Sequence, residues 1–190
     1  MRQNNVIIVI CEGQSEVAYI QELNRLFREM EIKAVLLPVC VGTGFFHDVQ
    51  MTYKRKRKEN PRTAIRIWVD WDIYARNERD CMDNYSGKAK GIPDFYFSRQ
   101  NFEDFLVTHL PKNQLDNWVN ICRQHGHLES PLQADEYMEL LHANIFSSYS
   151  KGMIPFELSN DMLKQMMTNQ EQVDLPFHCD FAKVIRMLMG

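Results

Sequence analysis

The chain has 190 residues, of which 45% are hydrophobic and 25% charged, and its formal net charge is −3. This length suits one domain with a buried core, and the composition is that of a soluble globular protein. The slightly acidic balance excludes a generally basic nucleic-acid-binding protein, so contact with a nucleic acid would need a local patch or a bound cation.

Short, continuously apolar runs rich in β-branched residues predict strands that are buried on both faces, as in a parallel sheet. These runs cover residues 6–11, 34–40, 64–69 and 95–98. Apolar residues at helical spacing predict one helix from an N-cap at Ser15 to Met30, and another from Phe45 to Lys58. The polar stretch 73–93 is typical of a long loop. This order predicts an α/β fold with a parallel sheet of about four strands flanked by helices.

The remainder of the chain predicts helices. Phe102, Phe105 and His109 share one helical face, and Pro111 ends that segment. Further helical patterns cover residues 115–122 and 137–145, and two more follow the candidate N-caps Ser159 and Asp180. We therefore expect an α/β core over residues 1–110 and a helical extension over residues 111–190, packed together as one compact unit.

Three carboxylates follow predicted strands where a ligand site would need them. Glu12 comes directly after the first strand, Asp70 ends the third, and Asp72 lies two residues further on. Ligands of open parallel sheets bind beyond the carboxyl ends of the strands, and clustered carboxylates suit Mg²⁺ or Mn²⁺. The alternative is that these residues are helix caps or solvated loop residues.

The run Val9-Ile10-Cys11-Glu12-Gly13 resembles the strand-Glu-Gly signature of TOPRIM domains, and Asp70-x-Asp72 resembles their second motif. Glu12-Gly13-x-x-Glu16 followed by Tyr19 is more closely similar to the RloB-like and OLD-type branch, which comprises nucleases associated with bacterial defence against phage. Two later elements are also similar to RloB-like proteins: Asn101-Phe102-Glu103-x-Phe105 with His109, and Tyr149-Ser150-Lys151-Gly152.

The resemblance implies a divalent-metal-dependent nuclease that cleaves phosphodiester bonds in DNA or RNA, with Mg²⁺ or Mn²⁺ as cofactor. Glu12 would be a metal ligand or general base, Asp70 and Asp72 would be ligands, and Lys151 or Arg99 would assist the phosphate. It also implies a role in phage defence, with a separate ATPase or other defence-system protein as partner.

Three further residues have a functional and a structural interpretation. Glu16 is either a further ligand of the site or a carboxylate that favours the helix dipole. Glu103 is either an additional ligand or a solvent-facing helix residue. His109 would contact phosphate or transfer a proton, although a lone helical histidine is more often structural.

The strongest local positive charge is a run at the end of the second predicted helix. Such a run can follow a phosphate backbone, and it can equally be a solvated helix end whose cations complement the dipole. The residues are Lys54, Arg55, Lys56, Arg57 and Lys58.

Other functions remain open at this level. A TOPRIM-like module that binds a nucleic acid or a partner protein without cutting fits the same sequence, and a phosphoacceptor receiver domain fits it less well because receivers group their acids differently. The five cysteines form no CxxC pair, which excludes a zinc knuckle and a CxxC redox motif. With no apolar stretch long enough to span a bilayer, we expect no membrane contact and a cytoplasmic location with reduced thiols.

Overall fold

The computed structural model describes residues 5–71 and 95–190. Its strands form one parallel sheet in the order β2-β1-β3-β4. They are β1 (Asn5–Cys11), β2 (Ala34–Cys40), β3 (Ala64–Asp70) and β4 (Phe95–Ser98). The predicted α/β fold with a four-stranded parallel sheet is therefore confirmed.

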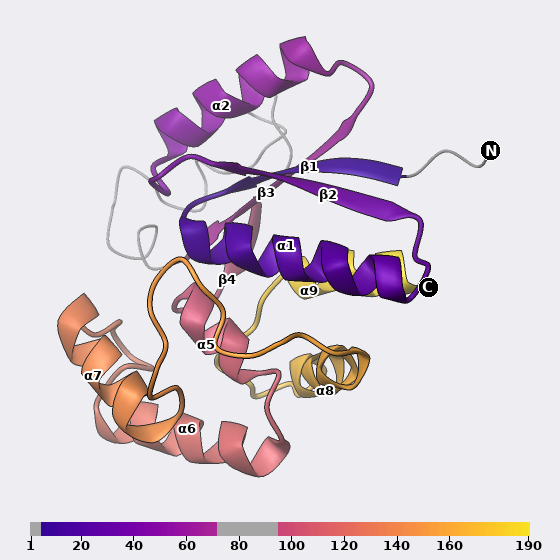
Figure 1. Ribbon diagram of the computed structural model, residues 1–190. Helices are drawn as coiled ribbons and strands as arrows, with labels where there is room; N and C mark the ends of the chain where they lie inside the picture. The colour runs from indigo at the N-terminus through magenta and orange to yellow at the C-terminus, as the bar shows by residue number, and fades with distance from the viewer. Residues whose placement is uncertain (1–4, 72–94) are drawn as a thin grey trace.

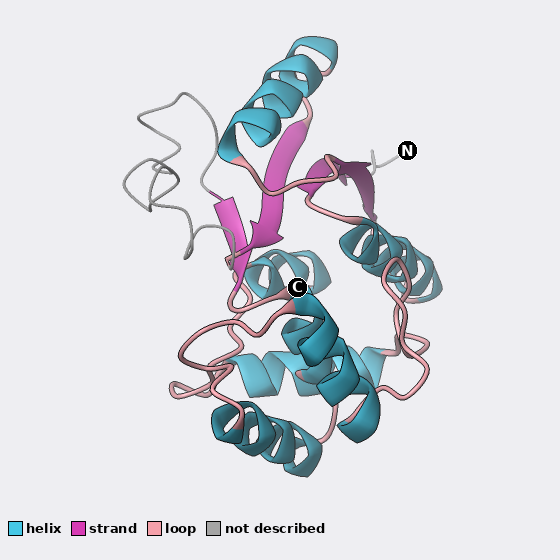
Figure 2. Ribbon diagram, turned by 90° about the vertical axis from the view of Figure 1, so that its left-hand side faces the viewer, coloured by secondary structure: helices cyan, strands magenta, loops and turns pink. Residues whose placement is uncertain are grey.

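Helices cover both faces of this sheet. The helices are α1 (Gln14–Glu29), α2 (Phe46–Glu59), α5 (Phe102–Val107), α6 (Lys112–Gln124), α7 (Ala134–Asn144), α8 (Asn160–Gln170) and α9 (Phe181–Met189). Of the described helices, α2 lies above the sheet in Figure 1, α1 and α9 lie directly below it, and α5 to α8 extend further down. Figure 2 shows the same layers from the side.

The alternation of side chains along β1 explains why the run is apolar throughout. Ile7 and Val9 belong to the core shared with α1 and the C-terminal helices, whereas Ile8 and Ile10 belong to the core beneath α2. A strand between two helical layers needs apolar residues at every position. The first of these cores continues from the sheet to α9.

Three predicted N-caps have different outcomes. Ser159 caps α8 as predicted, because its hydroxyl accepts a hydrogen bond from the Met162 backbone N–H (3.2 Å). Asp180 precedes α9, but its side chain makes no capping bond. The Ser15 prediction is wrong: α1 begins at Gln14 after Gly13, and Ser15 lies buried inside the first turn.

None of the helices within the described residues is long and apolar enough to cross a membrane. The four described cysteines form no disulfide; they are Cys11, Cys40, Cys122 and Cys179.

Candidate active site at the carboxyl edge of the sheet

The first two predicted carboxylates lie together at one edge of the sheet. β1 and β3 are neighbours and run in parallel, so both end at the same edge. Glu12 Oε2 accepts a hydrogen bond from the backbone N–H of Asp70 (3.1 Å), which ties the two strand ends together. Glu12 and Asp70 thus lie at the same edge of the sheet, as the predicted topology requires, while Asp72 lies outside the described residues.

Two more predicted residues reach this edge from the later part of the chain. Glu103 comes from α5, and Lys151 comes from the connection between α7 and α8. That connection, orange in Figure 1, passes beside the first turn of α1 and over α5. Together with Glu12 and Asp70, both residues line two adjoining pockets of about 350 and 180 Å³.

A chain of hydrogen bonds holds Glu103 and the Lys151 segment in place. The backbone N–H of Gly152 donates to Ser15 Oγ (3.0 Å), and Ser15 Oγ lies 3.1 Å from the hydroxyl of Tyr149. Tyr149 donates to Glu103 Oε1 (2.8 Å). If Ser15 donates to Tyr149, each hydroxyl gives one proton and accepts one, and the chain ends on a carboxylate. Sequence reasoning missed the roles of Ser15 and Tyr149, since residues so far apart carry no local signal of their pairing.

The carboxylates crowd negative charge into a poorly solvated place. Glu16 is 3% exposed, and its Oε2 accepts a hydrogen bond from the Gly13 backbone N–H (3.2 Å). Burial, together with the charges of Glu12 and Glu103, raises the pKa of Glu16 to about 8. Burial also raises the pKa of Glu103, against the lowering effect of its hydrogen bond from Tyr149.

The donor set of this edge fits a hard divalent cation. Glu12, Asp70 and Glu103 offer carboxylate oxygens from three separate segments, and oxygen ligands are those that Mg²⁺ and Mn²⁺ prefer. A cation between them would offset the mutual repulsion of these carboxylates. Lys151 is exposed at the same pockets, where its ammonium can meet an anionic substrate.

Glu103 lies in the candidate active site, whereas His109 lies in the hydrophobic core. Glu103 is 8% exposed and lines the site, so its interpretation as a solvent-facing residue is wrong. His109 is 1% exposed and packs in the core, where its Nε2 lies 2.8 Å from the Tyr19 hydroxyl. Burial lowers the pKa of His109 to about 4, and His109 lines neither pocket of the site, so its geometry is that of a core residue.

Arg99 follows β4 at the same edge of the sheet, where its guanidinium stacks over the Trp71 ring at 5.0 Å from the ring centroid. It does not line the two pockets between Glu12 and Lys151. Arg99 therefore flanks the carboxylates, on the side of β4.

The basic run lies at the other end of the sheet. Because α2 runs back from the end of β2 to the start of β3, its last turn lies near the amino ends of the strands. Arg57 Nη1 donates to the Thr63 carbonyl (2.9 Å), directly before β3, whereas Asp70 ends that strand. At about 3.3 Å per residue, the separation along the strand is roughly 20 Å.

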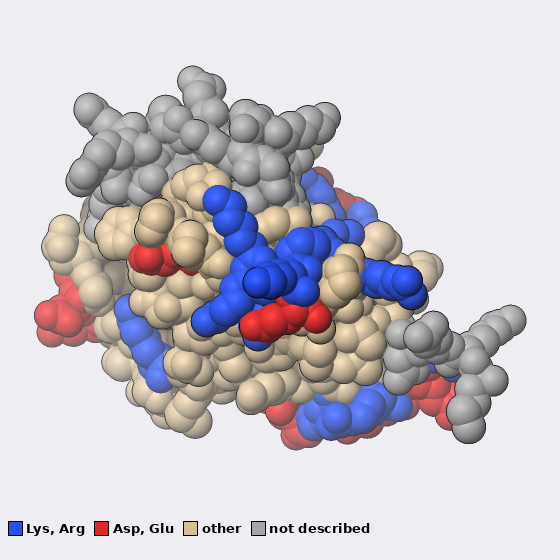
Figure 3. Space-filling model, turned by 90° about the horizontal axis from the view of Figure 1, so that it is seen from above, with Lys and Arg blue, Asp and Glu red and all other residues tan. Residues whose placement is uncertain are grey.

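The cations of this run are not equivalent. Lys56 pairs with Glu59 (2.8 Å), and Arg57 is held by its bond to Thr63 and by Tyr53. Figure 3, which looks down on α2, shows Lys and Arg side chains gathered on this face. The exposed members of the run are Lys54, Arg55 and Lys58, and Arg62, which follows the helix, is also exposed.

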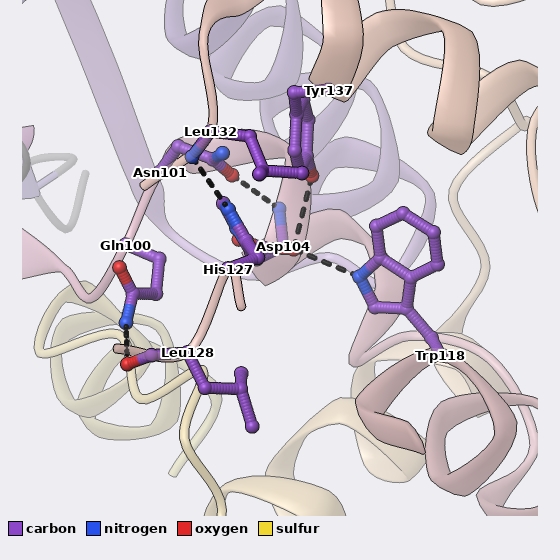
Figure 4. Close-up of polar contacts among 8 residues, drawn as sticks. All are labelled: Gln100, Asn101, Asp104, Trp118, His127, Leu128, Leu132 and Tyr137. Atoms are coloured by element: carbon purple, nitrogen blue, oxygen red, sulfur yellow. Dashed lines mark hydrogen bonds and ion pairs between the residues drawn. The ribbon is translucent and has the colours of Figure 1, made fainter. Parts of the chain in front are cut away.

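A second polar cluster, which sequence reasoning missed, lies around Asp104, where α5 meets the helical extension (Figure 4). Asp104 Oδ1 accepts from Trp118 Nε1 (2.8 Å) and from the Tyr137 hydroxyl (3.0 Å). Its Oδ2 lies 2.7 Å from His127 Nε2. A sequence signal did exist, because the predicted apolar faces of α6 and α7 carry Trp118 and Tyr137, whose polar atoms need an acceptor when they are buried.

Asp104, Cys122 and His127 also lie close enough to hold a metal ion. The hydrogen bonds explain the cluster without one. His127 Nδ1 accepts from the Leu132 backbone N–H (3.2 Å), so Nε2 carries the proton that it donates to Asp104. A metal-binding histidine needs a free nitrogen lone pair, and here the Nδ1 lone pair already accepts a hydrogen bond while Nε2 carries the proton. We interpret the cluster as a structural network that ties α5 to α6 and α7.

No protein-family model, curated protein or solved structure matches this chain. The TOPRIM resemblance therefore remains a prediction that rests on the motif residues themselves.

Proposed function

We propose that the protein is a divalent-metal-dependent nuclease that cleaves phosphodiester bonds at the carboxyl edge of its sheet. The observation that carries this proposal is the meeting of Glu12, Asp70 and Glu103 around pockets that Lys151 also lines. These residues come from four segments far apart in the sequence. The TOPRIM resemblance implies a role in phosphodiester cleavage for Glu12, Asp70 and Lys151. Glu103 is the additional ligand that the sequence offered as a candidate.

Each residue has a role that its surroundings support. Glu12, Asp70 and Glu103 would hold Mg²⁺ or Mn²⁺, with Asp72 as a further predicted ligand. When bound, such an ion activates water and stabilises the attacking and leaving oxygens of a phosphodiester. Lys151 would donate to a non-bridging phosphate oxygen, and Tyr149 keeps one oxygen of Glu103 fixed by its hydrogen bond (2.8 Å).

The wider setting is carried by the resemblance alone. It favours a cytoplasmic protein of phage defence that acts on DNA or RNA and works with a separate ATPase or other defence-system protein. The exposed cations of α2 support contact with a nucleic-acid backbone, and Arg99 would contribute from the β4 side.

Cleavage assays test the proposal directly. The protein is incubated with supercoiled plasmid and with a panel of RNAs, with Mg²⁺, with Mn²⁺ and with a chelator. We expect metal-dependent cleavage that Glu12→Gln abolishes. A control substitution, Asp161→Asn, removes a carboxylate with 94% side-chain exposure on α8 and should leave cleavage unchanged. Binding without cleavage by the wild type would instead favour the non-catalytic module, and equal cleavage by Glu12→Gln would refute the site.

A further inference from the structure

The smaller of the two pockets has walls of different chemistry. One wall is polar and belongs to the candidate active site, with Glu12, Asp70, Glu103 and Lys151 joined by Asn101. The opposite wall comes from the helical extension. It is formed mainly by apolar side chains that are neither fully buried nor fully exposed, namely Pro131, Leu132 and Met138.

The Asp104 network fixes both walls relative to each other. Tyr137, which also lines the pocket, bonds Asp104 through its hydroxyl (3.0 Å), and this bond places α7. The Leu132 backbone N–H bonds His127 (3.2 Å), whose other nitrogen reaches Asp104 (2.7 Å). Figure 4 shows Leu132 and Tyr137 arranged around Asp104. The apolar wall is therefore preformed and held by buried hydrogen bonds.

Asn101 supplies a polar group of defined orientation to this pocket. Its Oδ1 accepts from the Asp104 backbone N–H (2.9 Å), because Asn101 is the N-cap of α5. With the oxygen committed to the cap, the group that Asn101 can offer to a ligand is its Nδ2, which is a donor. An amide donor beside an apolar surface suits a flat ring that carries hydrogen-bond acceptors at its edge.

The volume of the pocket, and the residues that it shares with the larger pocket, further limit which ligand can bind there. Its volume of about 180 Å³ lies below the roughly 300–1,000 Å³ of sites for drug-sized ligands, so it suits one ring system. It shares Glu12, Asp70, Glu103 and Lys151 with the larger pocket. A group bound there would therefore lie next to a phosphate that is held at the carboxylates.

We propose that this pocket binds one unpaired nucleobase next to the phosphodiester held at Glu12 and Asp70. The inference rests on the proposed function, from which it takes the nucleic acid as ligand. Unstacked bases are recognised in proteins by apolar and aromatic contact with their faces and by hydrogen bonds to their edges. A base inside a duplex cannot enter, so the substrate class is single-stranded or locally unpaired nucleic acid.

Binding measurements with fluorescent oligonucleotides test this inference independently of catalysis. Fluorescence anisotropy compares single-stranded DNA and RNA with blunt duplexes of the same sequence, in buffer that contains Ca²⁺. We expect the wild type to bind at least one single strand about tenfold more tightly than its duplex, since one stacked base accounts for an effect of this order. Equal affinities, or no detectable binding of any oligonucleotide, would overturn the inference.

Substitutions test whether the pocket causes the tighter binding of the single strand. Met138→Trp fills the pocket and should weaken binding of the single strand about tenfold, whereas Met138→Ala should weaken it less. Met187→Trp is the matched control, because Met187 is 58% exposed on α9 and lines neither pocket of the site. Near-equal affinities of all four proteins would refute the pocket. Melting curves show whether each variant folds, and Met138→Ala keeps the test valid if Met138→Trp does not fold.

A small activated diester separates this inference from the proposed function. Hydrolysis of bis(p-nitrophenyl) phosphate by the wild type with Mn²⁺ tests the phosphodiester chemistry. Met138→Trp is measured instead for the rise in melting temperature that Mn²⁺ causes, which it should keep because Met138 is not a ligand of the ion. A rise that is lost in parallel with oligonucleotide binding would mean that Met138 supports the carboxylates, and would refute the base pocket. No hydrolysis of the diester by the wild type would count against the proposed chemistry while leaving the binding result to stand.

Discussion

Glu16 makes the stability of the metal-free protein depend on pH in a way that can be calculated. Its carboxyl group has a pKa of about 8 in the folded protein, against an ordinary value of 4.5, chiefly because it is buried. Between these two values the folded state keeps a proton that the unfolded state has lost. The free energy of unfolding must therefore fall as pH rises through this window.

His109 acts in the opposite direction and limits where the effect is visible. Burial lowers its pKa from 6.5 to about 4, so His109 contributes stability above pH 6.5 that is lost as pH falls toward 4. Below pH 6.5 the effects of His109 and Glu16 oppose each other. Above pH 6.5 folded His109 is neutral, and unfolded His109 loses its remaining charge by about pH 7.5. Its opposing effect over this range is therefore only about 0.4 kcal/mol, and the effect of Glu16 dominates.

The expected magnitude follows from the shift of Glu16. Between pH 6.5 and pH 8 the linkage relation gives a loss of about 1.5 kcal/mol in the free energy of unfolding. For a domain of this size that corresponds to a decrease of roughly 3–6 °C in melting temperature. Glu16→Gln removes the ionisable group while keeping an oxygen for the Gly13 N–H, so this part of the pH dependence should vanish.

Urea unfolding at pH 6.5, 7, 7.5 and 8 in the presence of a chelator measures the effect. Glu29→Gln is the control, because Glu29 lies on the same helix with 56% side-chain exposure. We expect it to follow the wild type, whereas Glu16→Gln should diverge from both by about 1.5 kcal/mol across the range. Parallel curves for wild type and Glu16→Gln would refute the argument that burial and neighbouring carboxylates hold the Glu16 proton.

Four more perturbations test other parts of the structure. Mg²⁺ at tenfold excess over its dissociation constant should stabilise the wild type by about 1.4 kcal/mol, or roughly 3–6 °C in a thermal melt. Asp70→Asn should largely lose this shift. Equal shifts in both proteins would mean that the ion binds elsewhere. Tyr149→Phe leaves the buried Glu103 carboxylate without its donor and should cost about 2 kcal/mol in urea unfolding, so a cost near zero would contradict the hydrogen-bond chain. Asp104→Asn should cost about 2–3 kcal/mol, because a buried donor loses its acceptor. A chelator should leave the melt of Asp70→Asn unchanged, and a clear drop of that melt with chelator would show that the Asp104 cluster holds a metal after all. The last substitution replaces the exposed cations of α2 with glutamine. The residues are Lys54, Arg55 and Lys58. Duplex affinity should fall, and the slope of log affinity against log salt should flatten by about 0.9 for each phosphate that the variant no longer neutralises. The control Lys56→Gln, whose ammonium already pairs within the helix, should change the slope less, and an unchanged slope in the triple variant would support a solvated helix end.

The sheet and its carboxyl edge were accessible from the sequence because they depend on local patterns. The apolar run of β1 predicts a strand between two helical layers. The β-α-β order predicts that neighbouring strands are parallel, so that their carboxyl ends lie at the same edge of the sheet. Glu12 and Asp70 directly follow or end such runs, so their convergence followed from topology alone. The same topology puts the basic end of α2 at the opposite edge, although its sequence does not decide between contact with a phosphate backbone and a solvated helix end.

Only the tertiary structure decided what surrounds these carboxylates. Helical spacing could not show that Glu103 is buried in the site while His109 is buried in the core, since both lie on the same short segment. The bond between Ser15 and Tyr149 joins residues 134 positions apart, and Trp118, Tyr137 and His127 reach Asp104 from separate segments. Periodicity in a sequence reports which face of an element is buried, because burial acts on each element separately. The partner of a buried polar group is chosen by how the elements pack together, and that choice fixed Glu103, Lys151 and the walls of the pocket beside them.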